Sequence, residues 1–250
     1  MSIKIYPFEE QVPGGFNDGA ILENRPVVMT DEKEGLQPYS NIFYWAHAWS
    51  DKGSTIGEHP HKVFEIMSFI TKGSIEHFDS HYKKWVPLKA GDAQIIRAGN
   101  GISHAEKINP ESEIFQIWLD PDITKTVKMP ATYNDYPSDI FPVTESSGLK
   151  IKTYAGIDGP MDMETPGVRI TEISFEKGTF KLDFEADKIN SIYVIEGKIK
   201  ISGSEINAND FIAVTEEKEV SFTSESKGRL FIIESPSKLD YMTYAERFGR

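Results

Sequence analysis

Two short motifs place metal-binding residue types at the same spacing. In HPH, His59 and His61 are two positions apart, and in HAE, His104 and Glu106 are also two positions apart. Residues i and i+2 of a β-strand point to the same face, so each pair projects its side chains together if it lies on a strand. Three neutral imidazoles and one carboxylate suit a divalent transition metal, with Fe(II) foremost and Zn, Mn, Co or Ni as alternatives.

The remaining histidines have simpler interpretations. All six histidines of the chain lie between positions 47 and 104. His47 lies on a Trp-rich strand face, where packing is expected, and His81 lies in the polar stretch SHYKK, where solvent exposure is expected. His77 has acidic neighbours in EHFDS, and we expect it to form a structural hydrogen bond rather than to bind metal. Only the two spaced pairs predict a metal site.

The elements that must position these pairs are β-strands. The stretch IFYWAHAW alternates between two faces, and TFKLDFEAD does the same, which is the period of a strand. Many short runs of this kind indicate a sandwich or a barrel. Pro60 cannot donate to a β-ladder, which places the first histidine pair on an edge strand or beside a bulge. Gly99 and Gly101 permit the tight backbone that would direct the second pair inward.

A weak internal repeat indicates that the fold is built twice. FITKGSIE, with Gly73, resembles VIEGKIKI, with Gly197, and AGDAQII, with Asp92, resembles ANDFIAV, with Asp210. Twelve and fourteen residues before Gly73 stand His61 and His59, and the same counts before Gly197 give Glu185 and Asp183. The second copy is therefore predicted to keep the scaffold without the imidazoles.

The repeat also predicts the domain boundaries. We expect a first domain with the metal site over residues 1–132 and a second domain without metal ligands over 149–250. Residues 133–148 are rich in Pro, Ser and Asp and are predicted to connect the two. The stretch KLDYMTYAERFG, closed by Gly249, is the clearest candidate helix.

Composition excludes several classes of protein. The 250 residues include 27 basic and 39 acidic side chains, for a net charge of −12, which disfavours nucleic acid or an anionic membrane as a direct partner. There is no cysteine, which excludes disulfides, thiolate zinc sites and cysteine nucleophiles. Neither a signal peptide nor an apolar run of 18 residues is found in the sequence. A cytoplasmic protein is expected.

The chain resembles the pirin family of bicupins, and its length is closer to the short, quercetinase-like bacterial branch. The likeness rests on four motifs in family order, which are HPHKVFEIMSF, GSIEHFDS, AGDAQIIRAGNGISHAE and FQIWLDP. Looser matches follow in GIDGP and YVIEGKI. It implies an all-β fold of two stacked cupin β-barrels of the jelly-roll type. It also implies that His59, His61, His104 and Glu106 bind one metal, and that Glu65 supports them without binding it.

The resemblance further implies a metal-dependent dioxygenase that cleaves the heterocycle of a quercetin-like flavonol. Its partners would be a small aromatic substrate and O2, and Glu106, the only carboxylate of the set, would be the catalytic base. The alternative is a metal-loaded regulatory protein that acts through a protein partner without turnover. A third option is a structural zinc in a closed tetrahedron of the same four residues.

Overall fold

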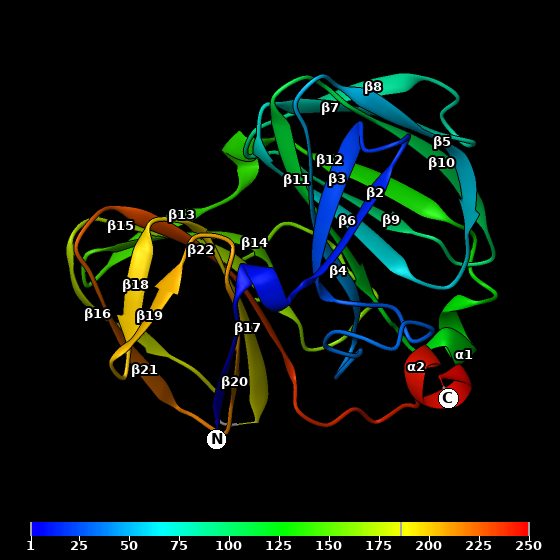
Figure 1. The fold of residues 1–250 in the computed structure, drawn as a ribbon. Coiled ribbons are helices and arrows are strands. Elements are labelled where there is room, and N and C mark those ends of the chain that lie inside the picture. The colour runs from blue at the N-terminus through cyan, green and yellow to red at the C-terminus, as the bar shows by residue number, and fades with distance from the viewer. Residues whose placement is uncertain (1, 186, 250) are drawn as a thin grey trace. The chain divides into compact units, whose positions relative to one another are not determined.

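The computed structural model describes residues 2–185 and 187–249, which form mainly antiparallel β-strands (Figure 1). The chain divides into two compact units. The N-terminal unit comprises Gln11–Ile140, Met163–Pro166 and Tyr241–Arg250, and the C-terminal unit comprises the ranges Met1–Glu10, Phe141–Asp162 and Gly167–Asp240. Each end of the chain therefore belongs to the unit formed mainly by the opposite half of the sequence.

The N-terminal unit contains two antiparallel sheets. The larger sheet has seven strands, in the order β12 (Thr132–Tyr136), β9 (Ala93–Arg97), β6 (Glu65–Lys72), β11 (Ser112–Leu119), β4 (Ile42–Ser50), β3 (Ile21–Val27) and β2 (Val12–Phe16). The smaller sheet has four strands, in the order β5 (Ser54–His61), β10 (Ile102–Ile108), β7 (Ser74–Asp79) and β8 (Trp85–Lys89). The unit also includes helix α1 (Ile123–Thr126), the 3-10 turn η2 (Ser138–Ile140) and helix α2 (Tyr244–Phe248).

The C-terminal unit repeats this plan. Its seven-stranded sheet has the order β1 (Ile3–Tyr6), β20 (Phe211–Thr215), β17 (Lys188–Glu196), β22 (Gly228–Pro236), β15 (Arg169–Phe175), β14 (Leu149–Ala155) and β13 (Val143–Ser146). Its four-stranded sheet has the order β16 (Gly178–Asp183), β21 (Glu219–Ser224), β18 (Lys198–Ile201) and β19 (Ser204–Asn207). A 3-10 turn, η1 (Phe8–Glu10), follows β1.

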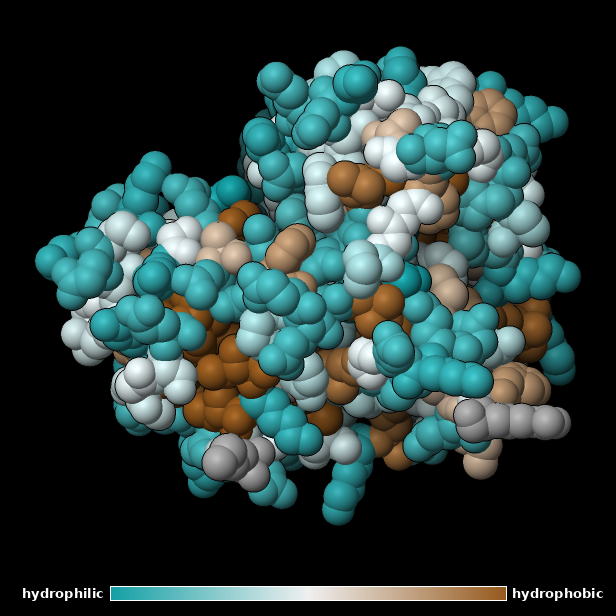
Figure 2. Space-filling view, in the orientation of Figure 1, coloured by the Kyte–Doolittle hydropathy of each residue, from teal (hydrophilic) through white to brown (hydrophobic). Residues whose placement is uncertain are grey.

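In each unit the two sheets share a hydrophobic core. In the N-terminal unit one such cluster joins Ile70 and Ile114 of the large sheet to Ile75 and Ile108 of the small sheet. The C-terminal cluster likewise takes buried side chains from both of its sheets. On the face drawn in Figure 2 the surface is mainly hydrophilic, and apolar side chains appear in separate groups. Two packed sheets are the usual construction of a jelly roll.

The internal repeat is visible in corresponding turns. The β6–β7 turn contains Gly73 at φ 71° and the β17–β18 turn contains Gly197 at φ 89°, a backbone region that favours glycine. Asp92 accepts a hydrogen bond from the amide of Lys89, three residues earlier, and Asp210 does the same with Asn207. The prediction of an all-β fold built from two related halves is confirmed.

The stretch 133–148, which was predicted to connect the two halves, includes most of strand β12 and all of strand β13. Residues 133–148 run from β12 of the N-terminal unit through η2 to β13 of the C-terminal unit. The predicted C-terminal helix is present as α2, which begins at a capping box of Thr243 and Glu246 and is capped by Gly249. Within the described residues no helix has the length and apolar character needed to cross a membrane.

Candidate metal centre

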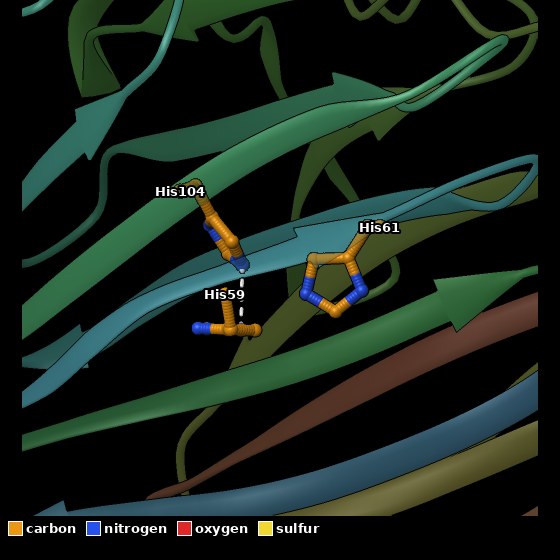
Figure 3. Close-up of side chains that lie close together, drawn as sticks. All are labelled: His59, His61 and His104. Atoms are coloured by element: carbon orange, nitrogen blue, oxygen red, sulfur yellow. Dashed lines mark hydrogen bonds between the residues drawn. The ribbon is translucent and has the colours of Figure 1, made fainter.

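Three of the four predicted ligands form one cluster. His59 and His61 on β5 and His104 on β10 each offer a nitrogen, and these nitrogens lie within 4.8 Å of one another. Figure 3 shows the three rings approaching one another from two neighbouring strands. His59 and His61 are partly exposed, whereas His104 is buried. The structure thus brings together side chains that are 43 residues apart in the sequence (61 to 104).

Strand register explains this convergence. β5 is the edge strand of the four-stranded sheet, as Pro60 predicts, and it pairs with β10 so that His59 lies opposite His104. The register shifts between His104 and Glu106, which marks a bulge there. Gly99 and Gly101, just before β10, have positive φ values of 45° and 134°. The edge position, the bulge and the glycine turn together direct His59, His61 and His104 to one place, while Glu106 lines the adjoining cavity.

The donor atoms suit a transition metal. Nδ1 of His59 lies 2.8 Å from the carbonyl oxygen of Gly57, so it carries the hydrogen and leaves the Nε2 lone pair free. Nε2 of His104 lies 3.1 Å from Nε2 of His59. Two neighbouring ligands at about 2.0–2.1 Å from one metal would be roughly 2.8–3.4 Å apart for angles between 90° and 109°, so the separation of this pair fits. Nε2 of His61 is buried and, within the described residues, has no hydrogen-bond partner.

The cluster favours neutral imidazoles. Burial, followed by the neighbouring rings of His104 and His59, lowers the pKa of His61 to about 3. Burial, followed by His59 and His77, lowers the pKa of His104 to about 2. Desolvation disfavours the charged form of a base, so these two rings are neutral at neutral pH. The neutral ring is the form whose lone pair binds a metal.

Glu106 lines the same cavity as the histidines, and two neutral donors hold its carboxylate. Oε1 accepts a hydrogen bond of 2.8 Å from the Ser68 hydroxyl, and Oε2 accepts one of 2.8 Å from Nε2 of Gln116. Each oxygen still has a lone pair after accepting one bond. Ser68 and Gln116 were not predicted from the sequence, although apolar residues flank each of them on both sides, in IMSFI and IFQIW, which was the available signal.

His77 orients one of the candidate ligands. Its Nε2 lies 3.2 Å from Nδ1 of His104, and its ring stacks on Tyr133 with a centroid distance of 4.8 Å. The side chain is fully buried. A hydrogen bond to the second nitrogen of a ligating imidazole fixes both its orientation and its tautomer. The expected hydrogen-bonding role of His77 is therefore confirmed.

We predict that His77→Phe weakens metal binding by about 10–100-fold, the usual cost of losing such a hydrogen-bond partner. Phenylalanine retains a ring that can stack on Tyr133 but cannot bond to His104. Competition titration of nickel(II) against a chelator measures the change. His81→Phe is the matched control, because His81 is exposed and lies outside the cluster. Equal affinities of His77→Phe and the parent would contradict the role of His77.

A cavity of about 350 Å³ opens beside the cluster. It lies in the N-terminal unit between β5 and β10 of the small sheet and β2, β3, β4 and β11 of the large sheet. Apolar side chains form most of its wall, which includes Phe16, Met29, Ile56, Ile108, Ile114 and Trp118. The Trp118 ring meets the His61 ring edge-on, with centroids 4.8 Å apart. This size and lining are typical of a site for a small organic molecule.

The remaining histidines and the other acidic residues considered in the sequence lie away from the cluster. His47 packs against Trp49 and Phe115, and His81 is exposed, as expected. The hydrogen bonds of Glu65 do not support a role beside the ligands, because its fully buried carboxylate accepts from the amides of Glu164 and Thr165. In the C-terminal unit, Asp183 and Glu185 are exposed.

Comparison with known proteins relates this site to a family. The pirin family model matches residues 26–119. A quercetin 2,3-dioxygenase of Escherichia coli K12 is 29% identical over 195 residues, which cover 74% of this chain and 78% of the relative. A pirin-like protein of Caulobacter vibrioides is 27% identical over 184 residues, which cover 71% of this chain and 75% of the relative. The resemblance inferred from the sequence is confirmed.

Solved structures show the same fold. A bacterial pirin from Escherichia coli in complex with nickel(II) superposes with a TM-score of 0.77 at 21% identity, covering 94% of this chain and 100% of that chain. A quercetin 2,3-dioxygenase from Acinetobacter baumannii gives a TM-score of 0.79 at 18% identity, covering 94% of this chain and 79% of that chain. At these identities the likeness establishes the fold, whereas function depends on the chemistry of the site.

Proposed function

We propose that this chain, which carries a pirin-family domain over residues 26–119, is a metal-dependent dioxygenase that opens the heterocycle of a quercetin-like flavonol. The observation that carries the proposal is the three-histidine cluster, which borders a largely apolar cavity of about 350 Å³. A metal with coordination positions open to such a cavity suits a reaction with an aromatic substrate and O2. The cavity also favours an enzyme over a structural zinc site, because a structural zinc has all four positions filled by protein ligands and needs no adjoining cavity.

In this proposal His59, His61, His104 and Glu106 hold one divalent transition metal, Fe(II) foremost. When bound, such a metal supplies Lewis acidity toward a substrate hydroxyl and reactivity toward O2. Glu106 accepts the proton of the flavonol hydroxyl on a carboxylate oxygen, since both oxygens keep a free lone pair. Ser68 and Gln116 hold the carboxylate in place through their bonds to Oε1 and Oε2. Trp118 and the apolar walls exclude water from the reacting groups.

The proposal is tested by oxygen uptake. Protein purified without oxygen and reconstituted with Fe(II) should consume O2 and quercetin in equal amounts, because a dioxygenase places both atoms of O2 in its product. The metal-free protein should show only the background rate. A fully loaded protein that leaves quercetin and a panel of catechols unchanged would contradict the enzyme and favour a metal-loaded regulatory protein.

A further inference from the structure

A polar pair, Glu23 and Tyr44, lines the same cavity as the histidines but comes from the other sheet. Glu23 lies on β3 and Tyr44 on β4, whereas the histidines lie on β5 and β10. The Tyr44 hydroxyl donates a hydrogen bond of 3.0 Å to Oε2 of Glu23. Both residues are buried, at 7% and 5% exposure. Neither has a part in holding the metal or in the proton transfer proposed above.

The pair offers hydrogen-bond acceptors to a molecule in the cavity. The hydroxyl hydrogen of Tyr44 is used on Glu23, so the Tyr44 oxygen can only accept. A carboxylate has about four lone-pair sites. At Glu23 the hydrogen bond from Tyr44 uses one, and Nε of Arg25 lies 3.4 Å from Oε1 as an ion-pair partner. Lone pairs of Glu23 therefore remain for a ligand.

Hydrogen-bond acceptors in an apolar cavity wall discriminate between ligands. A phenolic hydroxyl can donate to Glu23 or Tyr44, and its ring can pack against the apolar side chains around them. A hydrogen bond to a charged acceptor is roughly twice as strong as one between neutral groups. A ligand carboxylate in the same place would face a buried acidic side chain and would be repelled. The surroundings of the pair therefore favour a neutral, hydroxylated aromatic molecule.

We propose that Glu23 and Tyr44 form a hydroxyl-recognition subsite, which binds a phenolic hydroxyl of the substrate remote from the atoms held at the metal. Such a subsite selects a polyphenol as the substrate over an unsubstituted aromatic molecule or a small dicarboxylate. This inference rests on the proposed function, because it requires an aromatic substrate in the cavity.

The test measures binding without turnover. Quercetin, kaempferol and galangin share one flavonol core and carry two, one and no hydroxyls on the pendant ring. Their dissociation constants are measured by calorimetry with the full-length, nickel-loaded protein under anaerobic conditions. We expect the parent to bind quercetin about tenfold more tightly than galangin, as one hydrogen bond to a charged group provides. Glu23→Gln should reduce this preference to about twofold or less, and Tyr44→Phe should reduce it in part.

Glu32→Gln is the matched control. Glu32 also binds Arg25, at 2.7 Å, but it is not among the residues that line the cavity. Its replacement should leave the preference unchanged. A parent without preference, or a preference retained in both Glu23→Gln and Tyr44→Phe, would overturn the subsite. If Glu23→Gln and Tyr44→Phe abolish the preference for quercetin over galangin but the parent protein consumes no O2, the subsite is supported and the dioxygenase is contradicted. Normal O2 uptake with an unaltered preference would contradict the subsite alone.

Discussion

Replacing Glu106 with glutamine is expected to lower flavonol turnover by about 10²–10⁴-fold at saturating metal, the range typical of a lost general base. Glutamine preserves the volume and one oxygen but removes the charge and the basicity. Its amide nitrogen also cannot accept the bond that Ser68 or Gln116 now donates to the replaced oxygen. The measurement is the initial rate of O2 uptake, with metal content determined on the same sample.

The metal-saturated condition separates two roles of Glu106. If the carboxylate serves only to bind the metal, excess metal should restore the rate. If it also accepts the proton, the rate stays low with the site full. Glu58→Gln is the control, because Glu58 is exposed and lies beside His59 on the same strand, so it removes a nearby charge outside the cavity. Unchanged turnover in a metal-replete Glu106→Gln protein would rule out the base.

Replacing His104 with alanine should reduce metal affinity by more than about 100-fold, beyond the range expected for its hydrogen-bond partner His77. His104 is the buried member of the cluster, and its Nε2 faces that of His59 at 3.1 Å. The substitution removes one metal-binding nitrogen and the ring against which His59 and His61 are placed. Equilibrium titration with nickel(II) measures the affinity. Oxygen uptake should disappear at iron concentrations that are sufficient to load the parent protein.

His81→Ala provides the comparison for this substitution, since it removes an exposed imidazole on the same unit. It should leave both metal affinity and turnover unchanged. Metal bound by His104→Ala with the affinity of the parent would show that the histidine cluster is not the metal site.

Local sequence pattern was sufficient to predict the fold class and the pairing of site residues. A period of two identifies strands, and the same period puts His59 beside His61 on one face. Pro60 and the glycines before β10 indicate an edge strand and a tight turn, and both are found. The repeat around Gly73 and Gly197 predicted two related halves because each turn needs the same backbone.

Long-range pairing could not be predicted in this way. Strand β1 joins β20, more than 200 residues away, and α2 belongs to the N-terminal unit although it lies at the other end of the chain. No local pattern encodes such partners, because they depend on the register of strands distant in sequence. The same limit applies to Glu23 and Tyr44, which belong to no motif and come to line one cavity with the histidines only when the two sheets enclose it.

The most direct test of the metal centre is anomalous X-ray diffraction from crystals of the metal-loaded protein, recorded at the absorption edge of the metal. We predict one strong anomalous peak in the N-terminal unit, within bonding distance of nitrogens of His59, His61 and His104 and of the Glu106 carboxylate. A loaded crystal whose peak lies elsewhere, or which shows no peak between these side chains, would contradict this prediction.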